Sequence, residues 1–229
     1  LLVTRTLSLE QCKAQGLPKA YGLSLFVLDP KSQGISMTPL KTRGIEGFRQ
    51  WTVHFDQVEV PATNLVGEEN AGTMVLFSSL NPERILAGAI ACGMADYLIR
   101  KSVDYANTRR VFGDRPIGSY QSVAHPLAKL HIELEATRNL VYRAAWSYDQ
   151  GLDPATVGFY ANAGKYKAAE LALASADQAI QTHGGSGFDE DVGIIYYFEA
   201  ARLLKTAPIT AEMILNYVAE HKLGLPKSY

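Results

Sequence analysis

Two hydrophobic periods divide the chain, and the change falls near residue 71. Before it, apolar and polar residues alternate in four short segments bounded by glycine and proline, at 1–7, 22–30, 35–44 and 50–61. This alternation is typical of half-buried β-strands. Because the strands follow one another without intervening helical patterns, we predict an antiparallel arrangement.

After residue 71, apolar residues recur every three or four positions, which is typical of amphipathic helices. We predict three long helices and two shorter ones, with the third long helix at 154–183 and the shorter ones at about 189–205 and 210–222. The third helix carries a stripe of small residues, namely Ala161, Gly164, Ala168, Ala172 and Ala176. Small side chains allow helix axes to approach closely, as in a tightly packed bundle.

These patterns predict an α+β fold with two parts. Residues 1–68 are expected to form part of an antiparallel β-barrel or sandwich, and residues 69–229 an up-down four-helix bundle with short connections. The first strand starts without an initiator Met, and four strands alone leave an open sheet edge. We therefore expect the chain to be a fragment whose partner strands precede Leu1.

Composition narrows the classes of partner. Lys and Arg number 22 against 23 Asp and Glu, so the formal net charge is −1 and gives no basis for binding nucleic acid or an anionic membrane. No apolar run is long enough to predict a membrane span. Cys12 and Cys92 lie far apart, which argues against a disulfide scaffold and a zinc site and agrees with a reducing compartment. The five histidines show no metal-ligand spacing, so we predict no metal site.

Two segments with candidate chemistry each allow a plain structural interpretation. In RRVFGDRPIGSYQ, Arg109 can simply favour a helix C-terminus and Gly113 a turn, or the guanidinium can clamp a phosphate beside the ring of Phe112. In QTHGGSGF, the glycines can end a helix, or Gly184 and Gly185 can bare the backbone for a cofactor. A helix precedes these glycines, and therefore a Rossmann fingerprint is rejected.

A third segment, Asn81-Pro82-Glu83-Arg84, also has two interpretations. Asn81 can be an N-cap with Pro82 as the first helical residue, which makes Glu83 a first-turn acid that complements the helix dipole. Alternatively, Glu83 is a catalytic base.

The order of these segments is more specific than any one of them. VHFDQVEVPATNLVGEENAGT, a helix containing Glu83-Arg84, RRVFGDRPIGSYQ and QTHGGSGF follow one another along the chain. This order resembles the acyl-CoA dehydrogenase family of FAD-dependent enzymes. The resemblance covers essentially the whole chain, as the second half of the family's β-domain and its C-terminal helical domain. It also implies that the β-segments that contact the flavin ring precede Leu1.

The resemblance implies that two segments, RRVFGDRPIGSYQ and QTHGGSGF, contact FAD. Arg109 and Phe112 are expected at the pyrophosphate and adenine side of FAD, joined by Gln121. Gln181, Gly184 and Gly185 are expected to reach the FAD of a neighbouring subunit. These residues therefore imply an oligomer, usually a dimer of dimers.

The family's reaction implies a carboxylate base that removes the α-proton of an acyl thioester while hydride passes from the β-carbon to flavin N5. Burial suits such a base because it raises the pKa of a carboxyl group. The family usually carries this Glu in a Tyr-Glu-Gly-Thr motif, where this chain has Ala207-Pro208-Ile209-Thr210. Thr210 matches a threonine near the FAD adenosine.

A minority branch, the isovaleryl and long-chain enzymes, carries the base at the position of Glu83 instead. The resemblance thus implies Glu83 as the base, with Arg84 and Asn81 beside the substrate. The family also polarises the thioester with the backbone N–H at the position of Pro208, which has none. Ile209 as the donor, a changed polarisation, or a degenerate partner subunit are the alternatives.

The function expected from the resemblance is α,β-desaturation of an acyl-CoA by an FAD-dependent dehydrogenase, with this fragment alone inactive. An electron-transfer flavoprotein or similar acceptor is the expected redox partner. An acyl-CoA oxidase and a non-catalytic subunit of a mixed tetramer are the alternatives. We expect a bacterial-type cytoplasmic protein, with the mitochondrial matrix as the alternative location.

Overall fold

The computed structural model describes residues 1–45 and 47–227, apart from the side chain of Ser78. The chain forms two compact units. The first comprises Leu1–Thr42 and Gly47–Leu80, and the second comprises the rest of the described chain. The predicted domain boundary at residues 68–69 stays a prediction.

The first unit contains the four predicted strands and a fifth, Leu65–Val66, which was not predicted, in two small antiparallel sheets. The strands are β1 (Leu2–Arg5), β2 (Leu23–Phe26), β3 (Ile35–Pro39), β4 (Trp51–Phe55) and β5 (Leu65–Val66). One sheet has the order β1-β2-β5, and β3 pairs with β4 in the other. Leu25 of β2 faces Val3 and Val66 across the two ladders and is 1% exposed, so the core of this unit lies under the central strand. In the described part the strands close no barrel.

Sequence periodicity also missed the short helix α1 (Leu9–Ala14). Its start is fixed by a capping box, in which the Ser8 side chain accepts from the Gln11 backbone and the Gln11 side chain accepts from the Ser8 backbone. Six residues are too few for a hydrophobic period to appear, whereas Ser-x-x-Gln was a readable signal. A short 3₁₀ turn (Ala62–Asn64) precedes β5.

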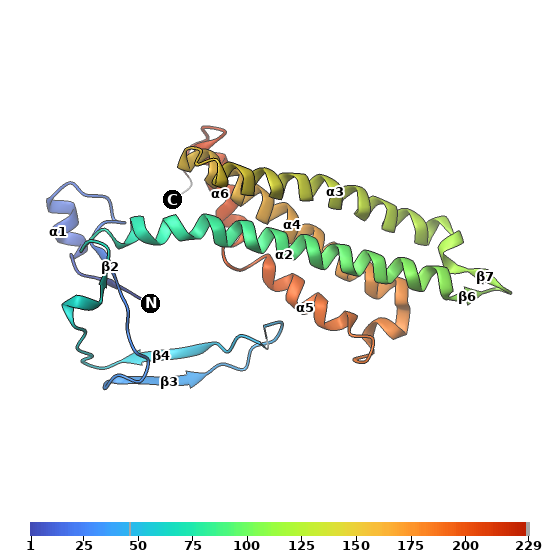
Figure 1. The fold of residues 1–229 in the computed structure, drawn as a ribbon, viewed down its shortest axis with the longest axis horizontal. Coiled ribbons are helices and arrows are strands. Elements are labelled where there is room, and N and C mark those ends of the chain that lie inside the picture. Colours follow the sequence, from blue (N-terminus) through green and yellow to red (C-terminus); the bar gives the residue numbers. More distant parts are fainter. Residues whose placement is uncertain (46, 228–229) are drawn as a thin grey trace. The chain divides into compact units, whose positions relative to one another are not determined.

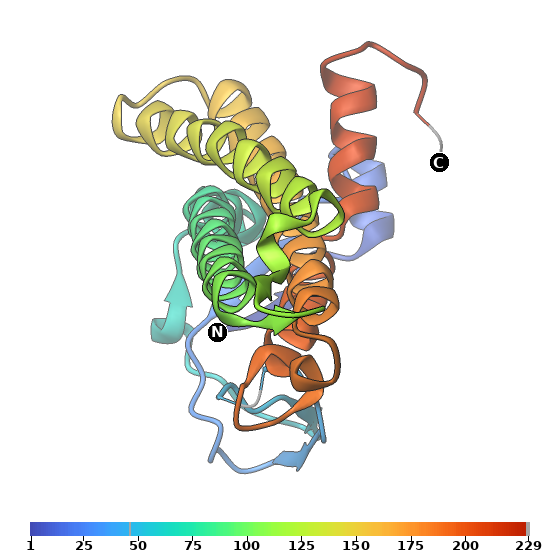
Figure 2. The ribbon, with the colours of Figure 1, turned by 90° about the vertical axis from the view of Figure 1, so that its right-hand side faces the viewer.

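The second unit is a helical bundle that confirms the predicted α+β class. Its helices are α2 (Gly72–Thr108), which begins within the first unit, α3 (Gln121–Asp149), α4 (Pro154–His183), α5 (Ile194–Leu204) and α6 (Ala211–His221). Helices α2 to α5 alternate in direction (Figure 1), and Figure 2 views the bundle nearly end on. Their apolar faces share one core, with Leu98, Leu134, Ala172 and Ile194 among its most buried members.

Glycines bring three helices of the bundle together. A Cβ placed on Gly88 of α2 would lie 3.2 Å from Cγ2 of Val141 in α3 and 3.6 Å from the carbonyl carbon of Gly164 in α4. The small-residue stripe of α4 therefore allows the close approach that the sequence predicted. Helix α4 has the predicted bounds and is capped by the carboxylate of Asp153.

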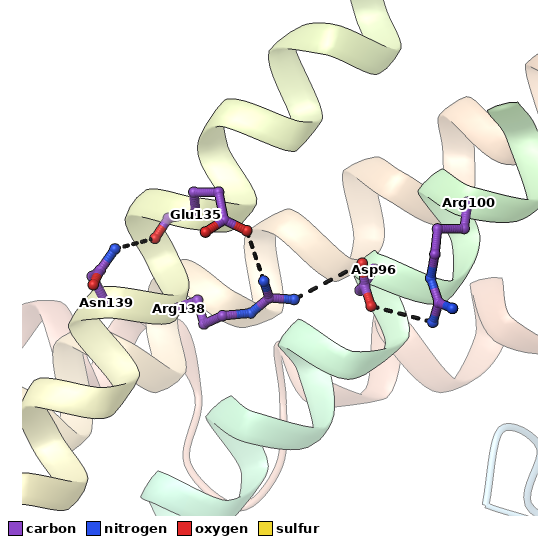
Figure 3. A network of polar contacts seen from close by, with 5 residues as sticks. All are labelled: Asp96, Arg100, Glu135, Arg138 and Asn139. Atoms are coloured by element: carbon purple, nitrogen blue, oxygen red, sulfur yellow. Dashed lines mark hydrogen bonds and ion pairs between the residues drawn. The ribbon is translucent and has the colours of Figure 1, made fainter.

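Ion pairs join α2 to α3 on the bundle surface. Figure 3 shows Arg138 of α3 between Glu135, at 2.7 Å on its own helix, and Asp96 of α2, at 3.9 Å. Asp96 also pairs with Arg100 at 3.2 Å. Exposed pairs of this kind contribute little to stability, so the bundle depends mainly on its core.

The segment after α2 is a hairpin and a turn. Strands β6 (Arg110–Val111) and β7 (Arg115–Pro116) pair with each other, and a 3₁₀ turn (Ile117–Ser119) leads into α3. After α4, another 3₁₀ turn (Gly184–Phe188) follows the helix end at Gly184, whose φ is +59°. Gly184 thus ends the helix in a conformation with positive φ, which glycine adopts readily.

The interpretation of Asn81 as an N-cap is wrong. Helix α2 begins at Gly72, so Asn81 lies within it, and Pro82 is an interior proline rather than the first helical residue. Glu83 is more than two turns from the helix start, beyond the reach of the terminal dipole. The explanation of Glu83 as a first-turn acid that complements the helix dipole therefore loses its physical basis.

Candidate active site and cofactor surface

Glu83 and its neighbours lie on α2 near the start of the second unit. The Glu83 side chain is exposed, whereas Arg84 is half-buried. The Arg84 guanidinium donates to Oδ1 of Asn81 at 3.3 Å, one turn earlier on the same helix. Burial lowers the pKa of Arg84, and the negative charge of Glu83 opposes that shift.

A buried lysine lies close to this arginine. Lys165 of α4 is 2% exposed, and its Nζ donates to the backbone carbonyl of Ile209 at 2.5 Å. Burial, and secondly the charge of Arg84, lower the pKa of Lys165 to about 8, while Glu212 acts in the opposite direction. Lys165 has no carboxylate within ion-pair distance in the described chain.

Helix α6 completes this group of residues. A Cβ on Gly158 of α4 would lie 3.5 Å from the hydroxyl of Tyr217 in α6 and 3.8 Å from Oδ1 of Asn81. We call Asn81, Arg84, Lys165, Ile209 and Tyr217 the cationic cluster. Its two cations donate to neutral oxygens, those of the Asn81 side chain and the Ile209 carbonyl, so the cluster favours an electron-rich group brought beside it.

Two more polar residues lie at the cluster. Asn162 is one helical turn before Lys165 and 4% exposed, and its Oδ1 has no hydrogen-bond partner in the described chain. Thr210 follows Ile209 directly and caps α6, since its hydroxyl accepts from the backbone N–H of Met213. The structure thus brings Thr210 to the same end of the bundle as Asn81 and Arg84.

The predicted cofactor residues other than Thr210 gather at the other end of α2. Arg109, Phe112 and Gln121 are all exposed, and Phe112 is 93% exposed with a positive φ of 49°. Arg110 forms an ion pair with Asp114 at 3.7 Å. The Arg109 guanidinium has no such partner among the described residues, so it is free to bind an anion.

The end of α4 lies beside this segment. The ring of His183 in α4 stacks on Tyr105 in α2 with centroids 4.3 Å apart. Gln181, Gly184 and Gly185 are exposed here, and a Cβ on either glycine would meet nothing within 4 Å. We call Arg109, Phe112, Gln121, Gln181, Gly184 and Gly185 the cofactor face. Its bare backbone, aromatic ring and unpaired guanidinium fit a dinucleotide such as FAD.

The cationic cluster and the cofactor face are well separated. Arg84 lies on α2 and Arg109 directly follows its last residue, Thr108, so 25 positions at about 1.5 Å each place them roughly 37 Å apart along the helix axis. A single compact ligand cannot contact both ends of one chain. The two groups serve one site only if a second chain supplies one of them.

Other classes of site find no support in the described residues. No three His, Cys, Asp or Glu side chains there could hold a metal ion. No described helix has the length and hydropathy of a membrane span. Cys12 and Cys92 are buried free thiols, and burial raises the pKa of Cys92.

Comparison with known proteins shows which family this chain belongs to. The model of the acyl-CoA dehydrogenase C-terminal domain matches residues 70–223. The chain belongs to the acyl-CoA dehydrogenase family. The acyl-CoA dehydrogenase FadE12 of Mycobacterium tuberculosis is 43% identical over 206 residues, which are 90% of this chain and 53% of FadE12. This chain therefore spans about half the length of that relative.

Solved structures of family members have the same fold. A glutaryl-CoA dehydrogenase in complex with glutaryl-CoA superposes with a TM-score of 0.86 and 28% identity, over 99% of this chain and 55% of that one. PigA with FAD and proline superposes with a TM-score of 0.83 and 26% identity, over 90% of this chain and 53% of PigA.

Lys165 and Asn162 were missed by the sequence reasoning, although a signal existed. Lys165 stands four residues after Ala161 and three before Ala168, and therefore lies in the buried small-residue stripe. Lysine is almost never fully buried without a partner. A lysine at a core position of a predicted helix was thus the signal for a polar site inside the bundle.

Proposed function

We propose that the complete protein is an FAD-dependent acyl-CoA dehydrogenase that desaturates an acyl thioester between its α and β carbons. The observation that carries the proposal is the position of Glu83, an exposed carboxylate within α2 and adjacent to a half-buried arginine. Family membership supports the reaction class, and the relative crystallised with glutaryl-CoA supports an acyl-CoA substrate.

Glu83 is the proposed base for the α-proton. Its carboxylate is exposed in this chain, so it can accept a proton from a substrate brought to the surface of α2. When substrate covers it, the carboxylate lies beside the acyl group and can act as the general base. At the family's more common position stands Pro208, whose ring has no acidic group.

Arg84 is the proposed direct source of charge stabilisation, and Lys165 adds to the positive potential around it without contacting the substrate. Loss of the α-proton moves negative charge onto the thioester oxygen, and preformed positive groups stabilise such charge strongly where water is excluded. Arg84 is held by Asn81, and Lys165 by the Ile209 carbonyl, so neither cation needs to reorganise during the reaction.

The cofactor face is the proposed contact surface for FAD. Arg109 can pair with its pyrophosphate, Phe112 can lie against a ring, and Gln121, Gln181, Gly184 and Gly185 can approach its polar edge. FAD supplies the acceptor for the β-hydride. The relative bound to FAD and proline supports a flavin in this family.

Two alternatives share this fold. An acyl-CoA oxidase would pass its electrons to oxygen, whereas the proposed dehydrogenase passes them to an electron-transfer flavoprotein or similar acceptor. A non-catalytic subunit of a mixed tetramer would lack activity alone. Pro208 is the feature that favours the last alternative.

The experiment uses the complete protein, purified with its flavin. Butyryl-CoA, glutaryl-CoA and a branched acyl-CoA are mixed with it without oxygen, and the flavin absorbance near 450 nm is followed. We expect at least one thioester to bleach the flavin. Bleaching followed by rapid oxygen consumption identifies an oxidase, and no bleaching by a protein that co-purifies with an active homologue identifies the partner subunit.

The cofactor face has its own test in a pair of neighbouring arginines. Arg109→Ala removes the unpaired cation, whereas Arg110→Ala removes one already paired with Asp114. A charge-assisted hydrogen bond contributes about 1.5–3 kcal/mol, so Arg109→Ala should weaken FAD binding by roughly 10- to 100-fold. Equal flavin retention by both variants after dialysis would contradict the assignment.

A further inference from the structure

The cationic cluster contains a lysine, Lys165, that forms no hydrogen bond or ion pair with Glu83 or the cofactor face among the described residues. Lys165 is 2% exposed, and its Nζ donates to a main-chain carbonyl, that of Ile209. A buried ammonium without a carboxylate is costly. A purely structural role could be filled by an apolar side chain of the same length, so the position of the charge needs another explanation.

The contact fixes one peptide group. Among the described residues, Ala207–Pro208 is the cis bond, so the peptide between Ile209 and Thr210 is trans. In a trans peptide the carbonyl and the following N–H point in opposite directions. With its carbonyl held by Lys165, this peptide directs the N–H of Thr210 away from α4.

That N–H is a free donor. Thr210 is partly exposed, and its backbone N–H makes no hydrogen bond to any described residue. The Thr210 hydroxyl, in contrast, is occupied by the N–H of Met213. A cation on the carbonyl side also polarises the peptide, which makes its N–H a stronger donor.

We propose that Lys165 is a positioning residue that orients the Ile209–Thr210 peptide, so that the Thr210 N–H donates to the carbonyl oxygen of the acyl thioester. This inference rests on the proposed function and extends it. It supplies a backbone donor two residues beyond Pro208, which has no N–H. Lys165 acts through the peptide and does not itself contact the substrate.

The first test compares lysines on one helix in the complete protein. Lys165→Met removes the buried charge, Lys165→Arg restores it, and Lys167→Met removes an exposed lysine paired with Glu133. Loss of one oxyanion donor lowers turnover by about 10²–10³-fold. Since misorientation is milder than loss, we expect Lys165→Met to slow flavin reduction by butyryl-CoA by about 10- to 100-fold. KM should change little, Lys165→Arg should recover part of the rate, and Lys167→Met should match the wild type.

The second test removes the donor itself and does not require a foldable Lys165 variant. The φ of Thr210 is −71°, close to the angle that proline fixes, so Thr210→Pro deletes the N–H with little backbone change. Thr210→Ala loses the same capping hydroxyl but keeps the N–H, and is therefore the reference. We expect reduction to be at least tenfold slower in Thr210→Pro than in Thr210→Ala.

A spectroscopic readout separates positioning from general damage. A ¹³C-carbonyl 3-thiaacyl-CoA, which has sulfur in place of the β-carbon and cannot be desaturated, is bound and its C=O stretch is recorded. The wild type and Lys167→Met should lower the stretching frequency relative to free ligand, whereas Lys165→Met and Thr210→Pro should lower it less.

The outcomes distinguish this inference from the proposed function. An active wild type with equal rates and equal C=O frequencies in Lys165→Met, or in Thr210→Pro against Thr210→Ala, overturns the positioning role. A wild type that no acyl-CoA reduces overturns the proposed function instead. Even then, a frequency shift that depends on Lys165 would support the orientation of the peptide.

Discussion

Charge and burial are opposed at Lys165, and this opposition has a measurable consequence. The side chain is 2% exposed, and the charged groups that act on it are Arg84 of α2 and Glu212 of α6. Its pKa is about 8 in the fold, against 10.5 in an unfolded chain. Between these values the unfolded chain binds more protons, so folding stability that depends on Lys165 rises with pH.

A pH series on the complete protein tests this prediction. We compare the free energy of unfolding of the wild type with that of Lys165→Met. The wild type's advantage should increase by roughly 2–3 kcal/mol from pH 7 to pH 10, because each unit of pKa difference corresponds to about 1.36 kcal/mol. Urea unfolding at each pH gives the difference. Lys167→Met is the control, and the difference in unfolding free energy between it and the wild type should not change with pH. A difference for Lys165→Met that also stays constant with pH would contradict a buried cation at this position.

Individual site residues were predictable to different degrees. Glu83 and Arg84 could be proposed from the sequence because they lie in a motif that is contiguous in it, and their roles stay predictions. Asn162 and Lys165 form a site only when α4 packs against α2 and α6, a contact between distant segments. One sequence does not specify such contacts, although a lysine in a small-residue stripe hints at one.

At the scale of the elements, glycine spacing controls how closely the helices pack. Gly88 of α2 faces α3 and α4 at van der Waals contact, whereas a Cβ on Gly93 of the same helix meets nothing within 4 Å. Gly88→Leu should therefore lower the free energy of unfolding by about 1–3 kcal/mol through overpacking. Gly93→Ala should raise it by about 0.5–1 kcal/mol, because alanine favours the helix.

Thermal unfolding of the two glycine variants checks this prediction. The midpoint of Gly88→Leu should fall and that of Gly93→Ala should rise relative to the wild type. If Gly88→Leu were as stable as the wild type, the three helices could not approach as closely as the structure describes.

Long periodic elements were predictable, and their ends were less so. Helix α4 has the predicted bounds because Asp153 and Pro154 mark its start and Gly184 its end. The start of α2 was misplaced because Asn81-Pro82 is a strong start signal. Here the helix runs on through Pro82 from Gly72, so tertiary context overrides the local signal.

At the scale of the whole molecule, we predict from the separation of the two groups that sites are shared between chains. Arg84 and Arg109 are roughly 37 Å apart along α2, so Glu83 of one chain and the cofactor face of another are expected to serve one flavin. This distance could not be predicted from the sequence alone, because it depends on α2 being one continuous helix.

Mixed oligomers test shared sites directly. Subunits with Glu83→Gln and subunits with Arg109→Ala are each expected to be inactive at limiting FAD, but a co-expressed mixture contains sites with both native residues. We expect the mixture to recover a substantial fraction of wild-type activity. No recovery, in oligomers shown by mass to contain both chains, would mean that each site draws both residues from one chain.

The most direct test of the central claim is flavin reduction by Glu83→Gln in the complete protein. The variant is mixed without oxygen, by stopped flow, with the acyl-CoA that reduces the wild-type flavin fastest. We expect it to bind FAD and this substrate as the wild type does. Its flavin reduction should slow by about 10²–10⁴-fold, the usual contribution of a general base. Glu135→Gln, an exposed glutamate on α3, is the control and should reduce at the wild-type rate. Reduction of Glu83→Gln at a near wild-type rate would contradict the account.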